Sequence, residues 1–485
     1  MITSKNICSK EFHGTIKQNV MMSYAELIQD IREDMLAGYT TEHLSAEFLQ
    51  ALKELVKDNK LESYTPLKFY WSTLLENLIY VVQLHEEILE TERNEEFEFS
   101  EAEDELFNFW NDSEMAQSFL EMLDENNNII EASAHLLTLL ENQILSFYYL
   151  HISNQEPNLK DVILYNAIPE IGDNEERLYI GESHKMADFE EPSDIFPNIA
   201  LKRIFSNKSG IEVEINTDLF EVPLLSNDSF IKLKGKKVYL LPSCNKGKEN
   251  LEQFKADTLK ALNIIEASSE GLLDTFLSFT HSLVPVNETG IVSYSMQSLP
   301  GFSSINMFDR DFVDLMDDLL HENGHHYLNT FLNYSELLNE DDDKIYYSPW
   351  RRALRPVRGI YHACFTFFWA LKLFHDLDLA IEEGKLEGIH QFSDDELLKI
   401  KKRAVEEYLM LTYCVEDLSH AYDNEKVTDE GNELIQSIYQ LVNEMKERVG
   451  QTFSYLNQHH VDASKELNEL AEHLREQRKH YELKS

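Results

Sequence analysis

Cysteine is scarce in this chain of 485 residues, which has four in all. They stand at Cys8, Cys244, Cys364 and Cys414, far apart and with no CxxC pair among them. This spacing argues against a disulfide framework and against a cysteine-rich zinc site. Such a chain is typical of a reducing compartment, and we therefore expect a cytoplasmic protein.

Long apolar runs are absent as well. No stretch of about 18 apolar residues occurs, so the sequence predicts no membrane-spanning helix. Residues 1–6 do not lead into an apolar segment, and a secretory signal is not expected. The sequence therefore does not predict a membrane protein or a secreted protein.

Basic residues are few relative to acidic ones. The chain has 43 Lys and Arg against 88 Asp and Glu, which is a formal net charge of −45. A surface this acidic repels nucleic acid and anionic lipid, so neither is an expected partner. It favours a neutral or cationic partner such as a basic peptide, although acidity also simply keeps a protein soluble. The sequence makes no prediction of oligomeric state.

The composition that remains is globular, with 43% hydrophobic and 11% aromatic residues. A chain of this length and composition has enough apolar residues to form the hydrophobic cores of two or three domains. The spacing of apolar residues divides the chain into four segments. Residues 1–155 are predicted to be helical, 156–249 to form strands and turns, 250–460 to be mostly helical, and 461–485 to be a charged helical tail. The HExxH motif described below makes 250–460 the expected metal-binding catalytic region.

Individual elements are predicted within these segments. Short β-branched runs predict strands, and apolar residues at three- and four-residue spacing predict helices. Thr428 precedes two acidic residues and is expected to cap a late helix. The expected strands are 211–215, 237–241, 291–295 and 303–306, and the expected helices are 311–333, 356–375 and the chain beyond 393.

The motif His321-Glu322-Asn323-Gly324-His325 has the HExxH spacing. Residues four apart lie on one face of a helix, so both imidazoles can reach one cation. Leucines around the motif indicate a buried helix, in which two histidines require partners. We therefore predict a mononuclear metal site on this pair, against the alternative of two hydrogen-bonded core histidines.

Four neighbours of the histidine pair have supporting roles in this interpretation. Asp314 and Asp318 lie on the same face, where they would accept hydrogen bonds from the ring nitrogens or favour the positive end of the helix dipole. His326 points about a quarter turn away and is expected to be structural or to support a ligand. Gly324 is a poor helix former, and its missing side chain is expected to allow a close approach.

A tight site needs a third ligand from elsewhere in the chain. The nearby candidates are Glu336 and the acidic run 340–343, which is equally well explained as a solvated loop. The distant candidate is His362, which stands in an otherwise apolar helical segment. A lone histidine there is more often a satisfied core residue than a ligand, so the residues by themselves leave both alternatives open.

An arginine cluster precedes His362, which is unusual in so acidic a chain. Pro356 suits the first position of a helix, which would place Arg355 at its start and Arg358 one turn before His362. A guanidinium group binds a carboxylate through two hydrogen bonds, so Arg351, Arg355 and Arg358 are candidates for holding an anionic co-substrate beside a metal. The alternative is a set of surface arginines paired with Asp and Glu.

Three segments in this order resemble a known family, the HExxH-type iron(II)- and 2-oxoglutarate-dependent peptide β-hydroxylases of ribosomal peptide natural-product (RiPP) clusters. The resemblance covers about residues 290–373, and its arginine and histidine string is more specific than the HExxH motif by itself. The segments are Ser293-Tyr294-Ser295 through Leu299-Pro300-Gly301, then Leu320-His321-Glu322-Asn323-Gly324-His325, then Ser348-Pro349-Trp350-Arg351 with Arg355-Pro356 and Gly359-Ile360-Tyr361-His362.

The resemblance implies a dioxygenase that hydroxylates the β-carbon of a side chain in a precursor peptide. It implies Fe(II) held by His321, His325 and His362, in place of the more usual two histidines and a carboxylate. It also implies O2 and 2-oxoglutarate as co-substrates, with Arg351 or Arg355 at the distal carboxylate. The expected fold is mainly α (α+β), with a helical N-terminal region, a small mixed β segment and a zincin-like metal-binding helix paired with a second apolar helix.

Two rival hypotheses stand beside this one. A zinc-dependent HExxH metallopeptidase would use Glu322 as the general base that activates a zinc-bound water, and it would not need the arginines. In the oxygenase hypothesis Glu322 has no obligatory role. The other rival is a non-catalytic peptide-binding protein with a vestigial site, against which the intact histidine pair and the arginines argue.

Overall fold

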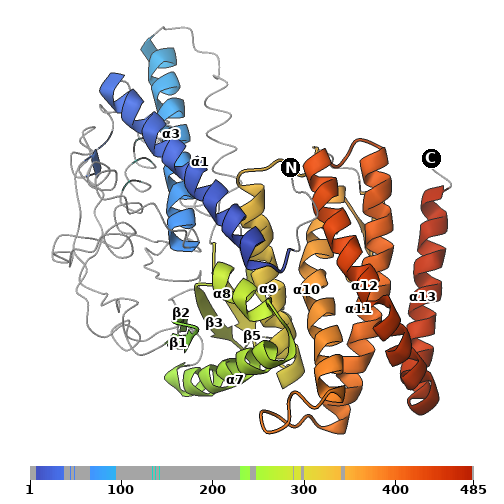
Figure 1. The fold of residues 1–485 in the computed structure, drawn as a ribbon. Helices are drawn as coiled ribbons and strands as arrows, with labels where there is room; N and C mark the ends of the chain where they lie inside the picture. Colours follow the sequence, from blue (N-terminus) through green and yellow to red (C-terminus); the bar gives the residue numbers. More distant parts are fainter. Residues whose placement is uncertain are drawn as a thin grey trace.

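The part of the chain that the computed structural model describes is mostly helical, with nine helices, a five-stranded sheet and a two-stranded sheet (Figure 1). The prediction of a mainly helical fold with a small mixed sheet is therefore confirmed. The predicted strand at 211–215 and most of the predicted strand-and-turn segment lie outside the described residues. The described residues are 7–37, 44, 48–49, 66–93, 134, 137, 141, 230–240, 247–287, 289–295, 300–339 and 344–482.

The larger sheet has the order β1-β2-β3-β5-β4. Its strands are β1 (Phe230–Leu233), β2 (Lys236–Leu240), β3 (Ser282–Val286), β4 (Tyr294–Ser295) and β5 (Phe302–Asn306). The three central strands are parallel, and β1 and β4 are antiparallel edge strands. Helices α7 (Gly247–Ser268) and α8 (Leu272–Phe279) connect β2 to β3, which allows these strands to run in the same direction.

Three of the predicted strands correspond to β2, β4 and β5, whereas β3 has no counterpart in the prediction. All five residues of β3 are buried, so its sequence shows no alternation of apolar and polar residues. A short apolar run of this kind cannot be distinguished from part of a buried helix by its periodicity.

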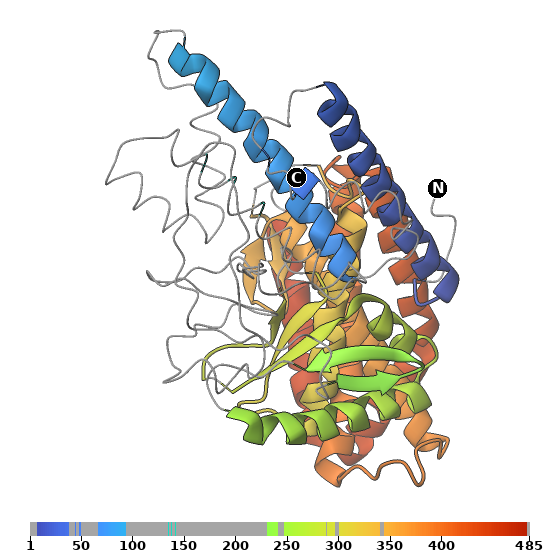
Figure 2. The same ribbon diagram turned by 90° about the vertical axis from the view of Figure 1, so that its left-hand side faces the viewer.

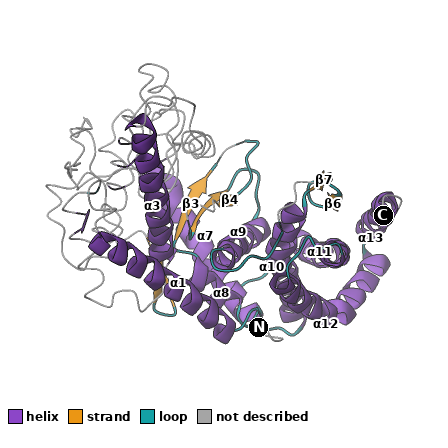
Figure 3. Cartoon of the chain, turned by 90° about the horizontal axis from the view of Figure 1, so that it is seen from above, coloured by secondary structure: helices purple, strands orange, loops and turns teal. Residues whose placement is uncertain are grey.

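The helices that carry the motifs begin close to their predicted positions. Helix α9 (Phe312–Leu332) starts after Asp311, whose carboxylate accepts hydrogen bonds from the backbone N–H groups of Val313 and Asp314 at 2.9 Å each. Helix α10 (Val357–Glu382) starts after Pro356. The two helices pack against each other over much of their length (Figures 1 and 3).

The C-terminal part of the chain completes the helical layer beside α10. It consists of α11 (Asp394–Asp423), α12 (Asp429–His459) and α13 (Val461–Glu482), and α11 packs against α10 and α12 (Figure 3). The predicted cap at Thr428 is confirmed, because its hydroxyl accepts a hydrogen bond from the backbone N–H of Gly431 at 3.0 Å. The predicted charged tail is α13, which buries Leu467 and Leu474 against this layer.

Two N-terminal helices, α1 (Lys10–Ala37) and α3 (Pro66–Arg93), contact each other and lie above the sheet in Figure 2. The start of the described chain reaches the core, where the Tyr327 hydroxyl donates a hydrogen bond to the Ile7 carbonyl at 2.9 Å. Cys8, Cys364 and Cys414 are buried. Among the described helices, none has the length and apolarity that crossing a membrane requires.

Candidate metal centre

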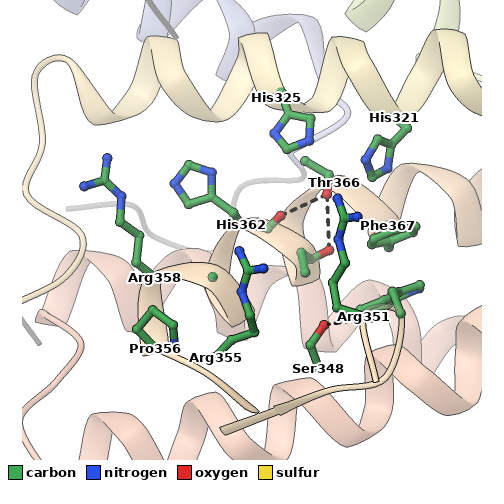
Figure 4. Close-up of a pocket in the computed structure, with 13 residues that line it drawn as sticks. His321, His325, Ser348, Arg351, Arg355, Pro356, Arg358, His362, Thr366 and Phe367 are labelled. Carbon is green, nitrogen blue, oxygen red and sulfur yellow. Dashed lines mark hydrogen bonds between the residues drawn. The ribbon is translucent and has the colours of Figure 1, made fainter. Parts of the chain in front are cut away.

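His321 and His325 leave α9 on the face that is turned toward α10 (Figure 4). Their ring centroids lie 5.0 Å apart with an interplanar angle of 81°. This arrangement follows from the spacing of four residues, which places the two side chains one helical turn apart on the same side. The sequence prediction that the pair shares one face of a helix is confirmed.

His362 approaches the same space from the second turn of α10 (Figure 4). Its ring centroid lies 6.4 Å from that of His325, with an interplanar angle of 34°. His362 follows His325 by 37 residues, and the packing of α10 against α9 brings it to the histidine pair. Sequence spacing by itself could not decide this proximity.

All three predicted arginines share a cavity with these histidines. The cavity has a volume of about 430 Å³, which lies within the usual range for a ligand pocket. Among the described residues that line it there is no Asp or Glu. The lining residues are His321, His325, Ser348, Trp350, Arg351, Arg355, Pro356, Arg358, Gly359, His362, Ala363, Thr366 and Phe367.

The three histidines are neutral at physiological pH. Burial lowers the pKa of His321 to about 3, and the positive charges of Arg403 and Arg351 act in the same direction. Burial also lowers the pKa of His362 to about 4, with a further contribution from Arg358. The pKa of His325 lies well below its ordinary value for the same reason, assisted by its two neighbouring histidines. Neutral imidazole is the form that binds a metal.

Two ring nitrogens in this cavity are buried without a hydrogen-bond partner among the described residues, Nδ1 of His321 and Nε2 of His362. A buried polar atom without a partner costs about 1–3 kcal/mol. A cation bound between the rings would remove this cost. The donor set, three neutral imidazoles, suits Fe(II) or Zn(II).

The three rings are close together but are not yet arranged around one point. The described residues contain no group of three His, Cys, Asp or Glu side chains already in position to hold a metal. Metal–imidazole bonds of about 2.1 Å put rings that share an ion roughly 5 Å apart between centroids. The His321–His325 pair meets this separation, whereas His362 must move closer to His325 to complete the set.

Gly324 sets the close packing of the two helices. A β-carbon added to it would lie 2.5 Å from Cδ1 of Trp369 and 3.3 Å from the Cα of Thr366, both on α10. The prediction that its missing side chain permits a close approach is confirmed, and the partner is Trp369. The backbone of α9 between the two motif histidines therefore lies directly on α10.

Arg351, Arg355 and Arg358 lie on and beside a β-hairpin that was not predicted from the sequence. Strands β6 (Tyr346–Ser348) and β7 (Ala353–Arg355) pair as an antiparallel two-stranded sheet immediately before α10. Arg352 occupies the left-handed region of the turn, with φ of 49°. The side chain of Arg355 lies over Gly359, because a β-carbon there would be 3.0 Å from its Nε. The short strands and tight turn gave no periodic signal.

Trp350 anchors this hairpin from inside the cavity. Its indole stacks on Phe367 with centroids 4.2 Å apart and an interplanar angle of 5°, and Phe367 in turn lies 4.4 Å from the ring of His321. The indole Nε1–H donates a hydrogen bond to Oε2 of Glu407 at 2.9 Å. Trp350 thus connects the arginine hairpin to a metal-site histidine and to α11.

A buried ionic network continues from this contact. Arg403 of α11 pairs with Glu407 at 2.9 Å and with Asp317 of α9 at 2.5 Å. Glu407 is fully buried, and burial raises its pKa to about 8 against the opposing effect of Arg403. The sequence reading missed these three residues. Their only local signal is the four-residue spacing of Arg403 and Glu407 and of Asp317 and His321.

Glu322 lies on a different side of α9 from the two histidines and does not line the cavity. Its side chain is buried, and its Oε2 accepts a hydrogen bond from the Ser295 hydroxyl of β4 at 2.7 Å. The structure therefore places this carboxylate against the edge of the sheet.

The two aspartates expected to support the histidines have other partners. Asp314 closes the capping box at the start of α9 and pairs with Lys399 at 2.6 Å, which agrees with the helix-end interpretation. Asp318 accepts a hydrogen bond from the Ser293 hydroxyl at 2.7 Å, and burial raises its pKa to about 6. The hypothesis that they accept hydrogen bonds from the metal-site imidazoles is wrong, because the carboxylates lie nearer the sheet and α11.

His326 is structural. Its Nδ1 accepts a hydrogen bond from the backbone N–H of Gly301 at 3.1 Å, so its Nε2 carries the proton and donates to the Ser303 hydroxyl at 2.9 Å. Of the acidic alternatives for a third ligand, Glu336 is exposed and does not line the cavity. Residues 340–343 lie outside the described residues.

Comparison with protein-family models and with curated proteins finds no match for this chain.

Proposed function

We propose that this protein is an iron(II)- and 2-oxoglutarate-dependent oxygenase that hydroxylates the β-carbon of a side chain in a ribosomally made precursor peptide. The observation that carries the proposal is one cavity of about 430 Å³ lined by three histidines and three arginines, with no carboxylate among the described residues that line it. A site for metal hydrolysis has no use for this concentration of positive charge, whereas a dicarboxylate co-substrate does.

His321, His325 and His362 would hold the iron. Support comes from their neutral state, from the unpartnered ring nitrogens of His321 and His362, and from the packing of α9 on α10 at Gly324. Bound iron would supply the activation of O2. We also propose that the arrangement is zincin-like, because an antiparallel edge strand, β4, accompanies the helix that carries the HExxH motif.

Arg351 or Arg355 would bind the distal carboxylate of 2-oxoglutarate. The guanidinium groups of both residues point from the hairpin toward the histidines in Figure 4. A planar guanidinium forms two parallel hydrogen bonds with a carboxylate and so fixes its orientation as well as its position. Trp350 and Glu407 hold the hairpin in place beneath this contact.

The reaction balances without a further reductant. One peptide C–H bond, one O2 and one 2-oxoglutarate give one C–OH group, one succinate and one CO2. Oxidation of the C–H bond and oxidative decarboxylation of the keto acid each supply two electrons, and together they reduce O2. One oxygen atom enters the hydroxyl group and the other enters succinate.

The zinc peptidase is supported by the HExxH string but not by the position of Glu322. A general base must lie within hydrogen-bond reach of the water that it activates. The Glu322 carboxylate instead contacts Ser295 and does not line the cavity.

The test is to load the full chain with Fe(II) and 2-oxoglutarate and to add small peptides encoded beside its gene, in air and without oxygen. We expect succinate formation and an oxygen-dependent gain of one oxygen atom on one peptide. Absence of this gain with every candidate peptide, together with no binding of 2-oxoglutarate to the iron form, would sink the proposal. Peptide cleavage by the zinc form, abolished in Glu322→Gln, would indicate the peptidase.

A further inference from the structure

The cavity carries more positive charge than the proposed co-substrate offsets. The permanently charged side chains among its described lining residues are the guanidinium groups of Arg351, Arg355 and Arg358. A divalent metal adds two positive charges, and 2-oxoglutarate brings only two negative ones. A three-histidine set contributes no carboxylate, unlike the usual two-histidine, one-carboxylate set. The charge of the metal and that of 2-oxoglutarate therefore cancel, and the charge of Arg355 has no counterion among the described residues.

Arg351 and Arg355 lack the carboxylate partner that several other arginines of the described structure have. Arg351 and Arg355 form no ion pair with any described residue, although the chain has 88 acidic residues. In contrast, carboxylates pair with each of four arginines elsewhere in the fold. Those four are Arg310, Arg403, Arg448 and Arg478.

The placement of the arginines separates them into two groups. Figure 4 shows Arg351 beside His321 and Thr366, whereas Arg355 and Arg358 lie on either side of His362. All three residues are exposed and line the cavity, so a bound peptide can reach their side chains. One group can therefore hold the co-substrate while the other contacts a second ligand.

We propose that Arg355 and Arg358 form a subsite for a carboxylate of the substrate peptide, which selects an acidic side chain close to the position that is modified. The inference rests on the proposed function for the assignment of Arg351 to 2-oxoglutarate. The net negative charge of the chain repels acidic peptides in general, whereas the guanidinium groups of this cavity attract a carboxylate. The subsite would then fix the register of the peptide in the cavity.

The test uses the full chain loaded with Co(II), which binds at imidazole sites without supporting turnover. Capped host peptides that differ only in one central residue, Asp or Asn, are titrated with and without saturating 2-oxoglutarate. Charge-assisted hydrogen bonds predict that the Asp peptide binds about tenfold more tightly. A third peptide, neutral along its length but with a free C-terminal carboxylate, distinguishes a chain terminus from a side chain as the source of the negative charge.

The variants are Arg355→Gln and Arg358→Gln, with Arg352→Gln as the matched control. Arg352 is an exposed arginine of the same hairpin that does not line the cavity. We expect both cavity variants to lose the preference for a carboxylate, Arg358→Gln to keep 2-oxoglutarate binding, and the control to retain both. Arg351→Gln is expected to weaken 2-oxoglutarate binding and to leave the peptide preference in place.

Equal binding of the Asp, Asn and free-terminus peptides would overturn the subsite. So would loss of the preference in Arg352→Gln, because that result indicates a general basic patch. A wild-type protein that prefers the Asp peptide but does not bind 2-oxoglutarate contradicts the proposed function and leaves the subsite standing. A preference for the free terminus over the Asp side chain overturns the selection of an acidic residue.

Discussion

A β-carbon placed on Gly324 would lie 2.5 Å from Cδ1 of Trp369, a separation that real β-carbons do not show. Gly324 stands between the two motif histidines on α9, and Trp369 lies two turns after His362 on α10. The contact between these residues therefore sets the distance between the helices that supply the proposed ligands.

Substitution Gly324→Ala is expected to push α9 and α10 apart. Overpacking of this kind costs about 1–3 kcal/mol, which outweighs the gain of about 1 kcal/mol from helix propensity. Urea denaturation measures the loss of stability, and a Co(II) titration should show weaker metal binding. Gly450→Ala is the matched control, because Gly450 is a helical glycine with nothing within 4 Å of an added β-carbon. It is expected to keep or raise stability, and equal destabilisation of both variants would contradict the role of the Gly324 contact.

Substitution His362→Ala is expected to weaken metal binding at least about tenfold, because it removes one of three imidazole donors. Glu336→Gln, at the acidic alternative, is expected to leave metal content unchanged, since this exposed side chain does not line the cavity. Metal analysis after dialysis measures both. Wild-type metal content in His362→Ala would transfer the role of third ligand to another residue.

Glu322→Gln is expected to retain metal binding and oxygen-dependent modification of the peptide. The amide of Gln keeps an oxygen that can accept the Ser295 hydroxyl, so the contact with β4 survives. Mass spectrometry of the peptide measures the result. Loss of all activity together with normal metal content would assign Glu322 to the chemistry, as the peptidase hypothesis requires.

Trp350→Phe is expected to weaken 2-oxoglutarate binding more than metal binding. Phe preserves stacking on Phe367 but removes the N–H that Glu407 accepts, so the buried carboxylate loses a partner at a cost of about 1–3 kcal/mol. The hairpin that carries Arg351 is then held less firmly. Calorimetric titration of the two ligands measures the difference.

Glu406, the residue before Glu407, provides the control for the network of Trp350, Glu407 and Arg403. Glu406 is 3.7 Å from Arg403 and is partly exposed, so Glu406→Gln is expected to change stability by less than about 1 kcal/mol. If Trp350→Phe weakens metal and 2-oxoglutarate binding to the same extent, the network supports the whole fold and not the hairpin in particular.

Metal binding is expected to resist acid. An exposed histidine has a pKa of about 6.5, so an exposed pair would lose affinity as the pH falls through that value. Burial lowers the pKa of His321 to about 3 and that of His362 to about 4, so protons compete with the metal only in that lower range. Affinity measured between about pH 8 and pH 5 should stay nearly constant. A tenfold loss centred near pH 6.5 would show that the site is open to water.

The sequence by itself determined the local elements of the site. The cap at Thr428 and the common face of His321 and His325 depend on residues within one or two helical turns, and both predictions are confirmed. The proline before α10 likewise placed Arg358 one turn before His362. Local spacing decides such features because helix geometry repeats every few residues.

Only the tertiary structure decided which distant residues meet. The packing of α9 on α10 brings His362 to the histidine pair, turns Glu322 toward β4, and buries Glu407 of α11 beneath Trp350. No sequence period encodes these contacts, because they depend on side-chain shape at one crossing of two helices. The contact between Gly324 and Trp369 is an example of this. The two residues are 45 positions apart, and the sequence shows only that Gly324 has no side chain, not which residue fills the space.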